Sequence, residues 1–221
     1  MALGKLTALQ ERLLVVLAGL DPPWTLSGGA ALVGFYTRHR ETRDLDLCWK
    51  DRRELGNLSG DVRARVERAG LEVAVIQRAD AFCRLEVRDG ADNVIVDLIA
   101  DPVPLAEAPR SATVQGATFL VDTPHQILVN KLCALLGRSE VRDLIDVKAL
   151  LEAGGDLRRA LEDAPQQDGG FSPLTLAWSM RGLPLRALSA ALKMPVDAIE
   201  ELERFRVGLV DRVLAEARPE G

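Results

Sequence analysis

The strongest structural signal comes from two neighbouring stretches, Ser27-Gly28-Gly29-Ala30-Ala31-Leu32 and Arg40-Glu41-Thr42-Arg43-Asp44-Leu45-Asp46-Leu47. The first predicts a glycine turn between a short extended segment, Trp24–Ser27, and a helix, Ala30–Arg38. The second predicts the beginning of a strand over Leu45–Trp49. Together they place a strand, a turn, a helix and a second strand near the start of the chain.

The aspartates of the second stretch are candidate metal ligands. Asp44 and Asp46 are two positions apart at the beginning of a strand, so both side chains project from the same face. Carboxylates this close resist joint ionisation, and a divalent cation removes that difficulty. Mg²⁺ prefers a few carboxylates together with phosphate oxygens. The alternative is a solvated strand start, where this spacing is also common.

A third carboxylate interrupts an apolar run. The segment Val94-Ile95-Val96-Asp97-Leu98-Ile99 is typical of a strand that is buried on both faces. An ionised Asp97 there would cost several kcal/mol unless it had a partner, and a metal ion would be one. The alternative is a strand-end aspartate that is hydrogen-bonded to backbone amides.

The glycine turn is a candidate phosphate site. Backbone N–H groups at the start of a helix attract phosphate, and Gly28 and Gly29 would let it approach closely. The hydroxyls of Ser27 and Thr42 would add hydrogen bonds. A plain helix-entry turn is the alternative. Because one predicted helix separates this turn from the aspartate pair, the two together predict a site for a nucleoside triphosphate and its metal ion.

The chain changes character at Thr123-Pro124, where an N-cap residue precedes a proline suited to the first helical position. Before this point we also expect helices over Leu6–Leu20 and Asp61–Ala69, strands over Leu71–Ile76, Phe82–Arg88 and Val94–Ala100, and a short strand pair around Gly116 within Ala112–Val121. After it we expect the helices His125–Leu136, Val141–Glu152, Leu157–Asp163, Pro173–Met180, Leu185–Leu192 and Val196–Ala217. We therefore predict an α+β protein, with a mixed sheet in residues 1–122 and a helical bundle in residues 123–221.

The helical half contributes a lysine and two aspartates. Lys131 lies at the margin of the apolar stripe of His125–Leu136, where it either extends to solvent or reaches into a cleft to hold phosphates. Asp143 and Asp146 are three positions apart and share a helix face, so one of them can position Lys131 or an incoming group. Asp146 is the preferred candidate, because Asp143 equally suits the first turn of a helix.

Composition limits the classes of protein to consider. With 48% hydrophobic residues and a net charge of −5, the chain can form a core but lacks the basic character usual in nucleic-acid binders. Its three cysteines, Cys48, Cys83 and Cys133, have no paired spacing. Glu11 and Arg12 interrupt the apolar residues near the N-terminus, and no apolar run reaches about 18 residues. We therefore expect a cytoplasmic protein without a membrane segment.

The order of these motifs resembles the AbiEii/AbiGii toxin family of the polymerase-β-like nucleotidyltransferase superfamily. The resemblance extends by motif from Leu26 to Leu151 and rests on Gly28-Gly29-Ala30-Ala31-Leu32, Arg40-x-Thr42-x-Asp44-Leu45-Asp46, Asp97, Lys131 and Arg142-Asp143-x-x-Asp146. It implies an N-terminal polymerase-β-like nucleotidyltransferase core and a C-terminal helical bundle that closes over the nucleotide site.

The resemblance also implies a reaction, the transfer of a nucleotide from an NTP with the help of Mg²⁺ or Mn²⁺. Asp44 and Asp46 would hold the metal ion, and we expect Asp97 to join them. The resemblance implies that Gly28 and Gly29 line the triphosphate site and that Lys131 contacts the phosphates, and we expect Ser27, Arg40 and Thr42 to join them in binding the nucleotide. Asp146 would match the late catalytic aspartate of the family.

The acceptor and the partners stay open at this point. Members of the family act as toxins in toxin–antitoxin or phage-defence pairs, and some add nucleotides to the acceptor end of tRNA, so the resemblance implies tRNA or another RNA and a cognate antitoxin. The acidic net charge does not suit tRNA. A local basic patch, formed by Arg38, His39, Arg40 and Arg43, nevertheless lies beside the predicted site.

Three other functions are compatible with parts of the sequence. One is a phosphotransferase on the same scaffold, with Thr42 taking part. Another is a DNA-binding regulator, since Leu185–Leu192 and Val196–Phe205 have the outline of a helix-turn-helix. The acidic residues Asp197, Glu200, Glu201 and Glu203 of the second helix would repel DNA phosphates. The third is an inactive nucleotidyltransferase that acts as an interaction module, against which the complete set of aspartates argues.

Overall fold

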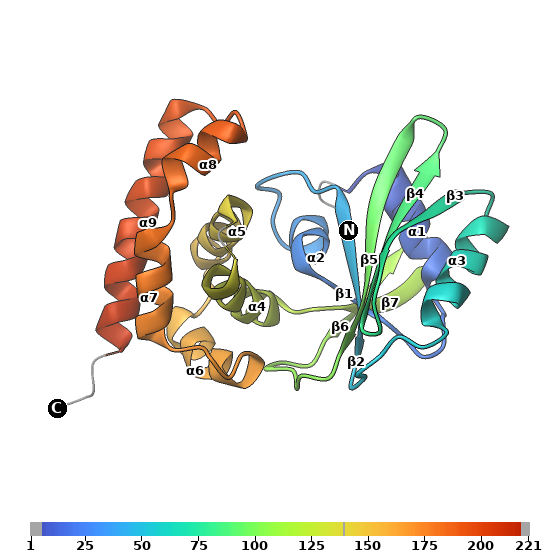
Figure 1. The fold of residues 1–221 in the computed structure, drawn as a ribbon, viewed down its shortest axis with the longest axis horizontal. Helices are drawn as coiled ribbons and strands as arrows, with labels where there is room; N and C mark the ends of the chain where they lie inside the picture. The colour runs from blue at the N-terminus through green and yellow to red at the C-terminus, as the bar shows by residue number, and fades with distance from the viewer. Residues whose placement is uncertain (1–5, 139, 218–221) are drawn as a thin grey trace. The chain divides into compact units, whose positions relative to one another are not determined.

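The computed structural model describes residues 6–138 and 140–217. In this part of the chain, seven strands form a single mixed sheet, and helices make up most of the remaining structure, as Figure 1 shows. The α+β class predicted from the sequence is therefore confirmed. The chain divides into two compact units, Met1–Thr123 and Pro124–Gly221.

The sheet belongs to the first unit. Its strands are β1 (Thr25–Ser27), β2 (Asp44–Lys50), β3 (Glu72–Arg78), β4 (Phe82–Asp89), β5 (Asp92–Asp101), β6 (Arg110–Val114) and β7 (Ala117–Val121). They lie in the order β3-β4-β5-β2-β1-β7-β6, with β2 parallel to β5 and β1 parallel to β7. The continuous apolar run that contains Asp97 is β5, an interior strand between β4 and β2, as such a run predicts.

Helices cover both faces of this sheet. Helices α1 (Ala8–Leu17) and α3 (Leu58–Arg68) contact each other on one side, and α2 (Gly28–Phe35) lies on the other side against β1 and β2 (Figure 1). Helix α1 begins with a capping box formed by Thr7 and Gln10. Helix α2 begins at Gly28 rather than at Ala30 as predicted, because the glycine pair forms its first turn.

The second unit is helical, as predicted. It contains α4 (Pro124–Gly137), α5 (Val141–Glu152), α6 (Leu157–Gln167), α7 (Pro173–Gly182), α8 (Leu185–Ala191) and α9 (Val196–Glu216). Helix α4 contacts α5, α6 and α7, and its residues Ile127, Leu128 and Val129 are completely buried. Helix α4 is therefore the centre of this unit. No helix in the described part of the chain is both long enough and apolar enough to span a membrane.

Candidate active site

Polar side chains form a row across the middle of the sheet. Strand pairing places Ser27 of β1 beside Asp46 of β2, and Asp46 beside Asp97 of β5. Arg84 of β4 pairs with Asp97 and continues the row. Because directly paired residues project from the same face of a sheet, these side chains lie together. Asp44, two positions before Asp46 on β2, lies on that face as well.

The carboxylate of Asp46 lies against the first residue of α2. Gly28 has a φ of +62°, and a Cβ at this position would lie 2.9 Å from Asp46 Cγ and closer still to Oδ2. Only glycine leaves room for this approach and adopts this φ without strain. The glycine turn and the predicted metal-binding aspartate are therefore neighbours at the positive end of a helix.

Two further predicted site residues converge on the second glycine. A Cβ on Gly29 would meet Arg40 Nη2 at 2.7 Å and Thr42 Oγ1 at 3.4 Å. Thr42 is buried, and its carbonyl oxygen accepts a hydrogen bond of 3.2 Å from Gln10 Nε2. The segment that contains Arg40 and Thr42 is thus held against the turn, with a guanidinium group beside the start of α2.

Arg84 is a site residue that the sequence analysis missed. Its Nε and Nη2 atoms donate to the two oxygens of Asp97 at 2.8 and 2.7 Å, which is the strong bidentate arrangement. These hydrogen bonds raise the pKa of Arg84, and the charges of Asp44 and Asp46 add to the effect although partial burial opposes it. All three predicted metal-binding aspartates therefore lie within electrostatic reach of one guanidinium group.

Asp97 therefore has Arg84 as its partner, whereas the sequence suggests a metal ion or backbone amide groups. It is buried, and in order to bind a metal ion with both oxygens it would have to release Arg84. Within residues 6–138 and 140–217, no group of three or more His, Cys, Asp or Glu side chains is positioned to hold a metal ion. The pair Asp44 and Asp46 still offers the donors that Mg²⁺ accepts together with phosphate oxygens.

A second buried carboxylate supports the turn. Ser27 Oγ donates to Asp122 Oδ2 at 2.6 Å, and Asp122 is completely buried. Its Oδ1 atom has no hydrogen-bond partner among the described residues. Burial raises the pKa of Asp122, although the hydrogen bond from Ser27 acts in the opposite direction. Asp122 therefore ties the residue that follows β7 to the residue that precedes α2, and no local sequence pattern marks it.

In the helical unit, Lys131 lies between two aspartates of α5. Its Nζ atom is 2.7 Å from Asp143 Oδ1 and 2.8 Å from Asp146 Oδ2. Arg138 Nε also binds Asp143, at 2.9 Å. Lys131 is only 7% exposed, so its side chain does not extend to solvent. Burial by itself lowers the pKa of Lys131, but Asp146 and Asp143 outweigh this effect, and the raised pKa keeps the lysine charged.

The predicted site residues are thus shared between the two units. The first unit holds Ser27, Gly28, Gly29, Arg40, Thr42, Asp44, Asp46 and Asp97, and the second holds Lys131 and Asp146. Within the first unit they gather around the start of α2 and the adjoining sheet face. Within the second, an ion pair joins Lys131 and Asp146 directly.

Comparisons with known proteins identify the family and support the fold. A profile of the family described as "Nucleotidyl transferase AbiEii toxin, Type IV TA system" matches residues 12–206, which include every candidate site residue. MenT4, a nucleotidyltransferase toxin from Mycobacterium tuberculosis H37Rv, is 17% identical over 95% of this chain and 91% of its own, with a TM-score of 0.58. JHP933 from Helicobacter pylori is 21% identical over 93% of this chain and 88% of its own, with a TM-score of 0.52. No curated protein sequence matches the chain. At these identities the two structures support the fold.

Proposed function

The chain belongs to the AbiEii nucleotidyltransferase toxin family, and we propose that it transfers a nucleotide from an NTP to an acceptor with the help of Mg²⁺ or Mn²⁺. The observation that carries the proposal is the approach of the Asp46 carboxylate to Gly28. It puts a candidate metal ligand beside the helix start at which backbone N–H groups attract phosphate. A triphosphate with its metal ion needs both kinds of group within one site.

Each residue around the turn has its own part in this proposal. The backbone of Gly28 and Gly29 receives the phosphates, Arg40 adds positive charge, and Thr42 adds a hydroxyl. Ser27 is held by Asp122 and fixes the start of the turn. The acceptor hydroxyl loses its proton to a base, its oxygen bonds to the α-phosphorus, and the bond between the α-phosphorus and the oxygen that bridges it to the β-phosphate breaks, so pyrophosphate leaves.

The aspartates supply the negative charge of the site. Asp44 and Asp46 would hold the metal ion, which when bound would neutralise charge that develops on the phosphate oxygens. We assign Asp97 as the third carboxylate. Arg84 orients Asp97 through its two hydrogen bonds and balances the charge of the neighbouring aspartates. The side chain of Arg84 is 41% exposed, so water can replace Asp97 as its hydrogen-bond partner when Asp97 binds the metal ion.

We assign Lys131 to the phosphates and Asp146 to the catalytic step. The support is chemical, since two aspartates keep Lys131 charged in a buried position. A phosphate oxygen can replace one of these carboxylate oxygens as acceptor without leaving the ammonium group unpaired. In this proposal residues 1–122 form the nucleotidyltransferase domain, and residues 123–221 form a helical domain that closes over the nucleotide.

RNA is the acceptor class that we propose, with tRNA as the first candidate. The segment between α2 and β2 carries Arg38, His39, Arg40 and Arg43, which are suited to contacts with backbone phosphates. We further propose that the protein acts as the toxin of a toxin–antitoxin or phage-defence pair and that an antitoxin protein is its partner. All three cysteines lie in the described part of the chain and are unpaired, which suits the reducing cytoplasm.

The test is incubation of the protein with each α-labelled NTP, Mg²⁺ and total RNA. We expect label to enter RNA while pyrophosphate is released. Release of a nucleoside diphosphate, with transfer of a γ-label, would instead identify a phosphotransferase. If no NTP labels any RNA under conditions in which the protein is folded, the proposed acceptor class is wrong.

A further inference from the structure

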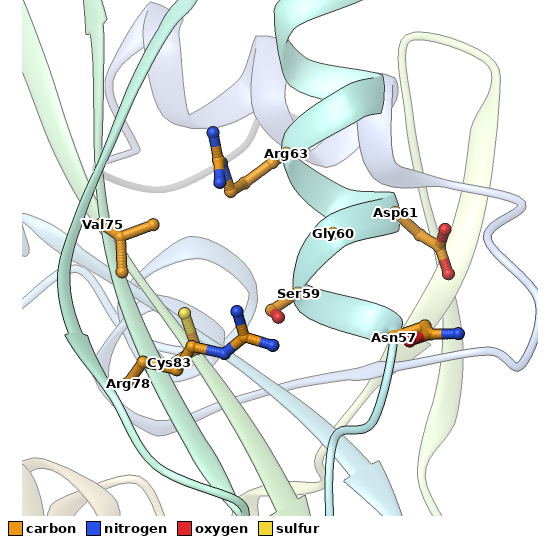
Figure 2. Close-up of a pocket in the computed structure, with 8 residues that line it drawn as sticks. All are labelled: Asn57, Ser59, Gly60, Asp61, Arg63, Val75, Arg78 and Cys83. Atoms are coloured by element: carbon orange, nitrogen blue, oxygen red, sulfur yellow. The ribbon is translucent and has the colours of Figure 1, made fainter.

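A separate cavity lies in the first unit, on the sheet face opposite to the polar row. It has a volume of about 280 Å³ and is lined by the start of α3 and by residues of β3 and β4, as Figure 2 shows. Cys83 of β4 forms part of its wall. The next residue, Arg84, projects from the other face and binds Asp97. The cavity is therefore not part of the candidate active site.

Two arginines enter this cavity from different elements. In Figure 2, Arg63 extends from α3 toward β3, and the guanidinium group of Arg78 extends from β3 toward the start of α3. Burial raises the pKa of the Cys83 thiol although Arg78 and Arg63 both act to lower it, so both guanidinium groups lie near the same point of the wall. The thiol stays neutral and does not occupy the site as an anion.

Neither arginine is strongly paired. The contact between Arg63 Nη2 and Glu67 Oε1 is 3.4 Å long, and both side chains are about half exposed, so this ion pair is weak. Arg78 has no ion pair with any residue that the structure describes. Asp61 also lines the cavity, but Figure 2 shows its carboxylate directed away from both arginines. The positive charge of the cavity is therefore not neutralised from within.

The start of α3 adds a buried residue with two unused donors. Ser59 is only 4% exposed, yet neither its hydroxyl nor its backbone N–H makes a hydrogen bond within residues 6–138 and 140–217. The side chain of the N-cap residue, Asn57, does not cap the helix either. The Ser59 hydroxyl is not one of the described side-chain atoms that are sealed from solvent without a partner, so it opens into the cavity, where the oxygen of a ligand can accept its hydrogen bond.

We propose that this cavity binds a phosphate group. The hydroxyl and N–H of Ser59 would donate to its oxygens, Arg63 and Arg78 would supply the charge, and the dipole of α3 would add to the attraction. The volume of the cavity is close to the lower limit for small-molecule pockets, about 300 Å³. It can therefore hold one phosphate group with a small attached moiety. The group comes either from a free phosphorylated compound or from an RNA strand.

The test uses inorganic phosphate as the probe and backbone amide NMR signals as the readout. At constant ionic strength, phosphate should shift the amide signals of Ser59 and Gly60 in a saturable way, whereas chloride should not. Arg78→Gln and Arg63→Gln should each weaken this binding at least tenfold, because each removes a charge that faces the anion. Arg68→Gln is the matched control, since Arg68 is an exposed arginine of the same helix that hydrogen-bonds only to its own helix backbone.

The absence of saturable shifts at Ser59 and Gly60, or equal affinity in the wild type and in the Arg63→Gln/Arg78→Gln double variant, would overturn the proposal. Asp46→Asn should bind phosphate at this cavity as the wild type does, so the result does not depend on the nucleotidyl-transfer reaction. A 5′-phosphorylated RNA oligonucleotide that displaces phosphate, while its dephosphorylated form does not, identifies RNA as the source. Equal binding of phosphate and a nucleoside monophosphate, without a gain from the oligonucleotide, identifies a free compound.

Discussion

Asp46 Oδ2 occupies the space in which any residue other than glycine at position 28 would carry its Cβ. The two residues lie on neighbouring elements, β2 and α2, and the contact fixes the carboxylate at the first turn of the helix. It explains why glycine is required there for two separate reasons, the positive φ and the close approach. Substitution of either residue tests the importance of this contact.

Gly28→Ala should abolish nucleotide transfer and lower stability. An alanine at a φ of +62° is strained by about 1–2 kcal/mol, and its Cβ would also displace the Asp46 carboxylate. Gly90→Ala is a matched control, because Gly90 has a φ of +60° but no atom within 4 Å of the added Cβ. Both variants should melt earlier than wild type in thermal unfolding, but only Gly28→Ala should lose activity. An active Gly28→Ala protein would contradict the arrangement of the site.

Asp46→Asn should reduce transfer by more than about 10²-fold while the fold stays intact. The substitution keeps the shape of the side chain but removes the charge that we propose binds the metal ion, and a metal ion contributes several kcal/mol to catalysis of this kind. Initial rates with labelled NTP, together with circular dichroism, measure the two effects separately. Asp92→Asn removes a carboxylate at the exposed start of β5 and should leave the rate unchanged. Near-normal turnover in Asp46→Asn would refute the metal-site assignment.

NTP binding should depend on a divalent cation. Asp44, Asp46 and Asp97 gather negative charge beside the turn, which would repel the triphosphate unless Mg²⁺ or Mn²⁺ joined them. Isothermal titration calorimetry should therefore detect NTP binding with either ion and a large loss of affinity in excess chelator. Equal affinity under the two conditions would mean that the aspartates do not act through a metal ion.

Local sequence signals predicted much of the fold. The glycine pair, the aspartate pair at the beginning of β2 and the Thr123-Pro124 helix start each involve residues that are close in the chain, and the structure forms the corresponding elements. Helical spacing likewise indicates that Asp143 and Asp146 share a face of α5. It could not tell which of them binds Lys131, because that choice depends on how α4 packs against α5, and the structure uses both.

The contacts that complete the site could not be predicted, because they join residues that are distant in the chain. Arg84 meets Asp97 only through the register between β4 and β5. Ser27 and Asp122 are 95 positions apart and meet because β7 lies beside β1. In both cases the residue types gave no local pattern, and only the order of strands in the sheet determines the partner.

The buried Asp122 should make stability depend on pH. Because burial raises its pKa in the folded state, the folded protein holds this proton more tightly than the unfolded chain does. The contribution of Asp122 to stability is therefore fully present below pH 3.8, the ordinary pKa of an aspartate side chain. It is lost as the pH rises through the raised pKa of the folded state. Asp122→Asn cannot titrate, so wild type should lose stability relative to this variant as pH increases from that value. Urea unfolding of both proteins across this range measures the difference, and a difference that is independent of pH would contradict it.

Lys131→Ala should cost far more activity and stability than Lys148→Ala. Lys131 is buried between Asp143 and Asp146, and breaking a buried ion pair from one side costs about 3–5 kcal/mol. Lys148 binds Glu152 and Glu201, whose side chains are 61% and 59% exposed, and such surface pairs contribute about 0–1 kcal/mol. In thermal unfolding, Lys131→Ala should melt at a clearly lower temperature than Lys148→Ala. In steady-state kinetics below both melting temperatures, Lys131→Ala should also show the lower activity.

A loss of activity in Lys131→Ala alone does not distinguish a phosphate contact from a packing role. The double variant Lys131→Met/Asp146→Asn removes the lysine together with one of the two buried charges that it balances, while Arg138 still binds the other, Asp143, so it should recover much of the lost stability. If Lys131 contacts the triphosphate and Asp146 takes part in catalysis, the double variant stays inactive although it is folded. If the ion pair serves only the packing of α4 against α5, activity returns with stability. A folded and active double variant would therefore confine catalysis to the residues around Gly28 and the sheet face that carries Asp46.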